Sequence, residues 1–439
     1  MERLLKYFKP EKYVLDLKVD KDKKTLEGVV TIFGEVKQET IKLHAVGLKV
    51  TDVLINGKKA KFKLDDGILE VYEVSGGEAE ITIYYSGTLN ENMEGAYLST
   101  YEYEGKIETI VATQFESHYA REAFPCIDEP AAKAVFELAI AIPEGTEDLV
   151  LSNMPELESN LEDGFRKVKF EPTPRMSTYL LAFVIGRFHG KTVKNQHGIE
   201  ITTYCSLAQA EDVVDFANEI AARSLEFYDD NFKEPYPLKK LDQVALPDFE
   251  AGAMENWGLV TYRESQLLVS KDATLGAKKA VALTVAHELS HQWFGDLVTM
   301  EWWDDLWLNE SFASVMEYYA VDKIHPEYKI FEGFFVGDCY AALTRDAYSG
   351  VQSVHQEVHD PAEIATLFDG AIVYAKGARL MLMLIRLMDW ENFCQGISEY
   401  FTKFKYQNTK GDDLWECLKP YAEFDPKTLM HAFIDEVLF

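Results

Sequence analysis

The sequence has few of the features that mark secreted or membrane-spanning proteins. Its five cysteines are an odd number without metal-type spacing, which predicts reduced thiols in a cytosolic protein and no cysteine-ligated zinc. No apolar run reaches the roughly eighteen residues of a membrane span, and even residues 378–388 are interrupted by Arg379 and Arg386. The first residues mix charges and lack the apolar core of a signal peptide. A cytoplasmic protein is expected.

Basic residues are also scarce. Lysine and arginine together number 44 against 74 aspartates and glutamates, for a net charge of −30. Phosphate binding needs clustered lysine and arginine, so neither nucleic acid nor an anionic membrane surface is expected as a partner. The negative field would favour cationic ligands, including free amino termini, although an acidic surface that only maintains solubility explains the charge at least as well.

The overall composition and the pattern of apolar residues are typical of a multidomain globular protein. Of the 439 residues, 47% are hydrophobic and 27% charged, which allows two to four domains and a large core. Alternating apolar and polar residues, as in 13–19 and 81–85, predict short antiparallel strands. Asn56-Gly57 and Asp66-Gly67 are hairpin-turn dipeptides between such runs. We find no internal repeat and no low-complexity segment.

Near His189-Gly190 the pattern changes from strands to helices. Apolar residues at helical spacing follow from Val213 onward, and the very apolar stretch Leu380 to Met388 predicts a buried helix. We therefore divide the chain into a β domain over residues 1–189 and a mainly helical domain over residues 190–439.

One motif in the helical part predicts a metal site. His287-Glu288-Leu289-Ser290-His291 lies in a predicted helix from Lys278 to Phe294 that ends at Gly295. Positions four apart share one helix face, so both histidines can bind one metal ion. Zinc in hydrolases usually takes three protein ligands and leaves a position to water. Glu310 is the best candidate for the third ligand.

The residues around these ligands extend the prediction. Glu288 points about 100° away from His287 around the helix, which suits a general base acting on a water molecule at the metal. Glu310 lies on a second predicted helix, for which Asp304 or Asp305 is the expected N-cap.

Three further segments have ordinary interpretations when they are considered alone. Gly252-Ala253-Met254-Glu255-Asn256 joins two predicted strands and is either a hairpin connection or an edge where an extended peptide can approach. Glu116, before the Pro-bounded loop 124–130, is typical of a solvated surface group. Tyr374, which precedes the buried helix, is typical of a packing residue.

Together, these motifs in this order closely resemble the aminopeptidase N family of gluzincin metallopeptidases. The resemblance implies an α+β architecture, with a saddle-like antiparallel β domain followed by a thermolysin-like, mainly helical catalytic domain. It also implies roles for single residues: His287, His291 and Glu310 as ligands of one Zn²⁺, Glu288 as general base, Glu255 and Glu116 as the site for the substrate's α-amino group, Tyr374 as stabiliser of the tetrahedral intermediate, Gly252 and Ala253 as the backbone edge beside the peptide, and Met254 in the first side-chain pocket.

The implied function is a zinc aminopeptidase that acts on peptides with a free N-terminus. Family members continue into a large helical domain, whereas this chain ends where the catalytic domain would end, so a fragment or a short form with a more open site is expected. Two alternatives stay open: an endopeptidase or leukotriene-hydrolase-like relative, and a catalytically weak or silent peptide-binding fragment with the same fold. The sequence carries no signal for an oligomeric state.

Overall fold

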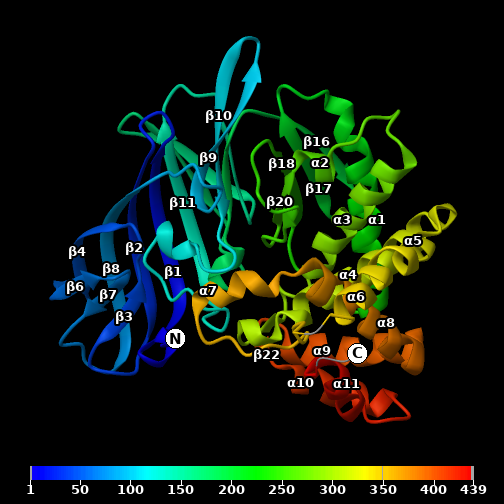
Figure 1. Ribbon diagram of the computed structural model, residues 1–439. Helices are drawn as coiled ribbons and strands as arrows, with labels where there is room; N and C mark the ends of the chain where they lie inside the picture. The colour runs from blue at the N-terminus through cyan, green and yellow to red at the C-terminus, as the bar shows by residue number, and fades with distance from the viewer. Residues whose placement is uncertain (1, 349, 437–439) are drawn as a thin grey trace.

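The computed structural model describes residues 2–348 and 350–436. A β domain, blue to cyan in Figure 1, lies beside a part in which helices dominate, green to red. The predicted α+β class is confirmed, since many strands precede a helical region. Within the described residues, no helix is long and apolar enough to cross a membrane.

The β domain contains three sheets. The eight-stranded sheet has the order β13 (Glu156–Glu162), β14 (Phe165–Phe170), β11 (Val135–Pro143), β1 (Phe8–Asp20), β2 (Thr25–Val36), β8 (Gly77–Thr88), β4 (Lys49–Ile55) and β5 (Lys58–Lys59). The four-stranded sheet has the order β12 (Leu149–Ser152), β15 (Phe183–Gly186), β10 (Lys106–Gln114) and β9 (Gly95–Tyr103), and the three-stranded sheet the order β3 (Ile41–His44), β7 (Ile68–Val71) and β6 (Phe62–Asp65).

The local signals for this domain are confirmed, with one correction to its topology. Both turn dipeptides have positive φ at both residues: 50° and 75° at Asn56-Gly57, and 47° and 73° at Asp66-Gly67, as type I′ hairpins require. The named strands of the domain pair antiparallel as predicted, except that β1 and β11 pair in parallel. β11 returns to β1 only after nine intervening strands, and such a long crossover is what parallel pairing needs.

The second part is built on a mixed five-stranded sheet with helices packed against it. The strand order is β16 (Phe188–Lys194), β17 (Glu200–Ser206), β18 (Lys240–Leu246), β20 (Leu259–Arg263) and β19 (Ala253–Met254). A small parallel pair joins β21 (Thr299–Met300) to β22 (Asn408–Thr409). The helices are α1 (Asp215–Phe232), α2 (Glu264–Leu267), α3 (Leu275–His291), α4 (Trp307–Ile324), α5 (Ile330–Val336), α6 (Asp338–Asp346), α7 (Pro361–Ile364), α8 (Gly377–Met388), α9 (Trp390–Phe404), α10 (Gly411–Leu418) and α11 (Pro426–Ile434).

The change from one part to the other falls between β15, which belongs to the four-stranded sheet, and β16, which begins the five-stranded sheet. The division of the chain at residue 190 stays a prediction, although it lies close to this point.

Helices α3 and α4 differ at their ends from what local sequence predicts. The side chain of Thr274 accepts a hydrogen bond from Ala277 N and caps α3, which ends at His291 rather than at Phe294. Neither predicted N-cap on α4 is correct: Leu306 occupies that position without a side-chain cap. Asp304 instead accepts a long-range hydrogen bond from Val358 N at 2.6 Å, and Asp305 accepts one from Trp307 Nε1, two residues further along, at 2.9 Å.

Candidate active site

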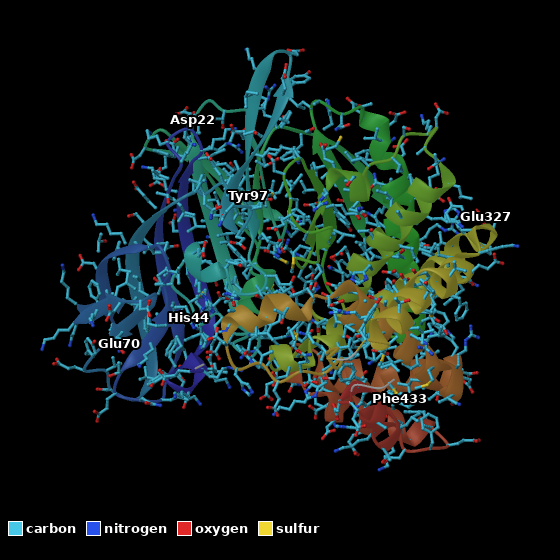
Figure 2. The ribbon with its side chains drawn as sticks, in the orientation of Figure 1. Asp22, His44, Glu70, Tyr97, Glu327 and Phe433 are labelled. Atoms are coloured by element: carbon cyan, nitrogen blue, oxygen red, sulfur yellow. The ribbon has the colours of Figure 1, made fainter. Side chains whose placement is uncertain are left out.

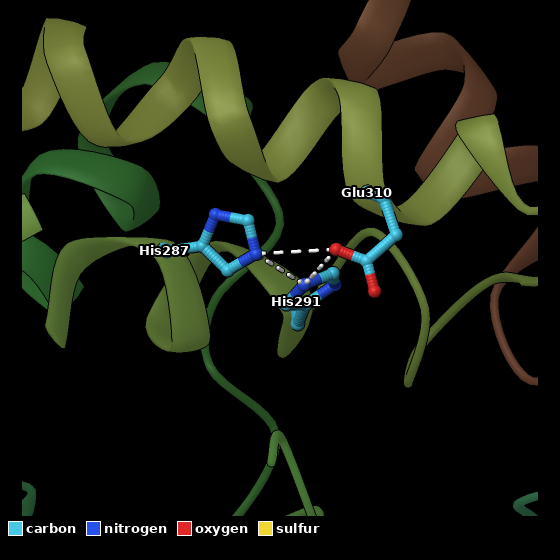
Figure 3. A group of neighbouring side chains, drawn as sticks. All are labelled: His287, His291 and Glu310. Atoms are coloured by element: carbon cyan, nitrogen blue, oxygen red, sulfur yellow. Dashed lines mark hydrogen bonds and ion pairs between the residues drawn. The ribbon is translucent and has the colours of Figure 1, made fainter. Parts of the chain in front are cut away.

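Helices α3 and α4 bring the three predicted metal ligands together (Figure 3). His291 Nε2 lies 3.0 Å from His287 Nε2 and 3.4 Å from Glu310 Oε2, and His287 Nε2 lies 3.2 Å from the same oxygen. All three side chains are buried. Ligands that surround one zinc ion at about 2.0–2.1 Å are separated by about 3.3 Å in a tetrahedron, so these spacings fit one ion.

The turn after α3 makes this approach possible. Gly295 has φ of 132°, and a Cβ added there would lie 3.1 Å from Asn309 Nδ2 on α4 and 3.4 Å from His291 Nδ1. A larger residue would crowd the Asn309 amide and the His291 ring, and it would be strained at this φ. The predicted helix end at Gly295 is therefore also a position of close backbone approach.

The second nitrogen of each imidazole is already bound. His291 Nδ1 lies 2.9 Å from the carbonyl oxygen of Phe294, and His287 Nδ1 lies 2.7 Å from Glu317 Oε2. Since a carbonyl only accepts hydrogen bonds, His291 Nδ1 carries the proton, and the carboxylate holds His287 in the same way. Both Nε2 atoms therefore face each other and the Glu310 carboxylate, an arrangement that favours a cation between them.

The electrostatics agree with that requirement. Burial lowers the pKa of His291, but the carboxylates of Glu255 and Glu310 outweigh this effect and raise it to about 9. Burial opposes protonation of His287 as well, and hydrogen bonds to Glu310 and Glu317 nevertheless raise its pKa well above the ordinary value. The site attracts positive charge, whether as protons or as a metal ion. The residues present fit Zn²⁺, which imidazole and carboxylate ligands suit.

Glu288 lies beside the ligand cluster and lines the same cavity. Burial raises its pKa to about 8, although the two neighbouring histidines lower it in part. Among the described residues its Oε2 atom has no hydrogen-bond partner. A carboxyl group with this pKa can both accept and release a proton near neutrality.

A cavity of about 770 Å³ joins these residues to the other predicted site residues. Its lining includes Glu116, Gly252, Ala253, Glu255, His287, Glu288, His291, Glu310 and Tyr374. Met254 is fully buried and is absent from this lining, so its place in a side-chain pocket stays a prediction without support from the cavity.

Two carboxylates in the cavity each have one oxygen atom without a hydrogen-bond partner in the part of the chain that the structure describes. Glu255 is 3% exposed and its Oε1 atom is unpaired, as is Oε1 of Glu116. Burial raises the pKa of both groups, and their mutual repulsion raises that of Glu116 further. Unpaired buried carboxylates are costly, so this end of the cavity favours a cationic ligand.

The remaining predicted residues take positions suited to a peptide. β19, with Ala253, pairs only with β20 in the five-stranded sheet and forms its edge among the described strands. An edge strand offers backbone groups to an added peptide strand. Tyr374 lies with its ring centroid 6.0 Å from that of His287. Burial and the nearby Glu310 raise the pKa of Tyr374 well above its ordinary value, so its hydroxyl remains a hydrogen-bond donor.

Sequence reasoning missed Glu317 as a site residue. It lies seven residues after Glu310, two turns further along the same face of α4, and contacts His287. That spacing is the signal that points to it.

Comparison with known proteins agrees with this geometry. Residues 216–433 match the model described as the peptidase family M1 domain, and residues 9–180 match the peptidase M1 N-terminal domain. The chain is 50% identical over 441 residues to aminopeptidase N of Lactococcus lactis subsp. lactis and 47% identical over 439 residues to aminopeptidase N of Lactobacillus delbrueckii subsp. lactis. It is 39% identical over 451 residues to endoplasmic reticulum aminopeptidase 1 of Rattus norvegicus.

These alignments cover 99%, 99% and 98% of this chain but only 52%, 52% and 48% of the three relatives. The chain therefore spans about half the length of the curated relatives that it matches.

Proposed function

The chain belongs to peptidase family M1, and from this premise we propose that it carries the catalytic site of a zinc aminopeptidase that removes the N-terminal residue from peptides. The observation that carries the proposal is one cavity with the His287, His291 and Glu310 cluster beside Glu116 and Glu255, each with a buried Oε1 atom that has no partner among the described residues. A free α-amino group is the cation that these carboxylates suit. A cytoplasmic location stays a prediction.

We assign one Zn²⁺ to the three ligands, because their nitrogen and oxygen atoms converge on one point. When bound, the ion would supply Lewis acidity to the scissile carbonyl group and lower the pKa of water. Glu317 and the carbonyl of Phe294 hold the histidines with Nε2 directed to the ion.

The carboxylates of Glu116 and Glu255 would determine how the substrate is positioned. An α-amino group has a pKa of about 7.7–8.0 and is largely protonated near neutrality. Glu255 and Glu116 would bind that ammonium group through charge-assisted hydrogen bonds, and the backbone of Gly252 and Ala253 would accompany the peptide along the edge of β19. Because the amine is held beside the ligand cluster, the first peptide bond is the one that reaches it.

Two residues act on the reacting atoms. Glu288 accepts a proton from the attacking water at its free Oε2 atom and delivers it to the leaving amine, for which its pKa of about 8 is suited. The Tyr374 hydroxyl donates to the oxyanion that forms from the carbonyl oxygen.

The test compares an amino-acid anilide with its N-acetylated form. Glu288→Gln is expected to retain zinc and lose about 10²–10⁴ in turnover, whereas His291→Ala loses the metal as well. We expect the unblocked anilide alone to be cleaved. Equal cleavage of both substrates would overturn the exopeptidase assignment, and an unchanged rate in Glu288→Gln would remove that residue from the mechanism.

A further inference from the structure

The two carboxylates of the amine site come from different domains. Glu116 follows β10 of the four-stranded sheet, and Glu255 follows β19 of the five-stranded sheet. Their separation therefore depends on how the segment 248–258, which carries Glu255, is held against the β domain. Both ends of this segment are bonded to elements of the four-stranded sheet.

At the first end, Asp248 is bound to β9. Its Oδ2 atom accepts hydrogen bonds from Ser99 Oγ at 3.0 Å and Thr100 N at 2.9 Å. Its backbone N donates to Ser99 Oγ at 3.0 Å, and its carbonyl accepts from Tyr97 Oη at 2.9 Å. Tyr97, labelled in Figure 2, lies where the strands of the β domain meet the second domain. Four hydrogen bonds thus tie one residue of the segment to one strand.

At the other end of the segment, both the nitrogen and the oxygen of the Asn153 side-chain amide form hydrogen bonds. Its Nδ2 atom donates to the carbonyls of Trp257 at 2.9 Å and Leu180 at 2.7 Å, while Oδ1 accepts from Ala182 N at 2.9 Å. Asn153 is 1% exposed and follows β12 directly. A Cβ on Gly258 would lie 2.6 Å from the carbonyl oxygen of Asn153, so the two backbones are in close contact here.

The residues between these two ends are hydrogen-bonded to the second domain, by Arg263 at the end of β20 and by Gln292 after α3. Arg263 donates to the carbonyls of Phe249 and Glu250, and Gln292 Nε2 donates to the carbonyl of Glu255 at 3.2 Å. The hydrogen bonds of Asp248 and Asn153 join the segment that carries Glu255 to the β domain, which carries Glu116.

We propose that Asp248 and Asn153 are positioning residues: through Ser99 and Trp257, they hold the amine-binding Glu255 at its working distance from Glu116. The inference rests on the proposed function, because it concerns how the amine site of that reaction is assembled. Its consequence is that loosening either contact weakens recognition of the free amino group while leaving the metal cluster intact.

The experiment uses two zinc-binding probes, L-leucine hydroxamate and N-acetyl-L-leucine hydroxamate, which differ only in the free amine. In Asp248→Ala and in Ser99→Ala, we expect the preference for the free-amine probe to fall about tenfold, since a small displacement weakens a charge-assisted contact strongly. Zinc content and affinity for the acetylated probe should stay unchanged, while the melting temperature should fall slightly because each variant loses hydrogen bonds. The double variant should lose less than the sum of the two single losses, because both single variants remove the hydrogen bond between Ser99 Oγ and Asp248 Oδ2.

Asp22→Ala is the matched control, because Asp22 lines the same surface hollow as Asp248. We expect no change in its preference. Asn153→Ala tests the other end, but Asn153 and Ser99 are both buried, so the decision falls on the exposed Asp248. An unchanged preference in Asp248→Ala, or equal loss of affinity for both probes, overturns the positioning role. A wild-type protein without preference for the free amine overturns the proposed function instead.

Discussion

The hydrogen bond between His287 and Glu317 allows a quantitative prediction about metal affinity. Glu317 Oε2 lies 2.7 Å from His287 Nδ1, and their side chains are only 14% and 12% exposed. In Glu317→Leu the Nδ1–H group would be buried without an acceptor, which costs about 1–3 kcal/mol. The imidazole would also lose the partner that holds its orientation. We expect the zinc affinity to fall about 10–100-fold, or about 1.4–2.7 kcal/mol.

Competition with a chromophoric chelator measures this affinity directly. Glu317→Gln should show an intermediate loss, because its amide oxygen can still accept the hydrogen bond but carries no charge. Asp322→Asn, on the same helix α4, is the matched control and should bind zinc as tightly as the wild type. If Glu317→Leu keeps the wild-type affinity, the proposed orientation of His287 by this carboxylate is refuted.

Three other perturbations have distinct expected outcomes. Tyr374→Phe removes the donor to the oxyanion and should lower kcat about 10²–10³-fold, with zinc content unchanged; a normal kcat would contradict the role. Removal of the metal with a chelator should abolish turnover and lower Tm, and added zinc should restore both. Burial lowers the pKa of Lys133 to about 7 in the folded protein. Between pH 7 and about pH 10 the unfolded chain therefore binds one proton more than the folded protein at this side chain. Relative to Lys133→Met, the free energy of unfolding should rise by about 1.4 kcal/mol per pH unit over that range. Urea unfolding at pH 7 and 9 measures the difference, and equal slopes for both proteins would exclude this proton linkage.

Local sequence was sufficient for features that depend on helix or strand periodicity. The spacing of His287 and His291 places them on one face of a helix whatever the rest of the fold does. The dipeptides Asn56-Gly57 and Asp66-Gly67 specified their turns, because few other residues tolerate positive φ at both positions. The apolar stretch Leu380 to Met388 likewise predicted the buried helix α8.

The prediction of Glu310 as a metal ligand needed one more assumption, namely that its helix, α4, packs against helix α3, which carries the two histidines. The structure supplies that contact through Gly295, where the backbone leaves room for Asn309 of α4. Local signals did not reveal the partner of Asp304, because its hydrogen bond to Val358 joins segments that are 54 residues apart.

The amino-acid sequence thus determined the chemistry at the centre of the site: two imidazoles, a carboxylate and an adjacent base at helical spacing. Only the tertiary structure decided which buried groups surround them, including the contact of Glu317 with His287 and of Asp248 with Ser99, 149 positions away in the sequence. The physical reason is that periodicity sets the direction of a side chain on its own element, whereas its partner is chosen by how distant elements pack.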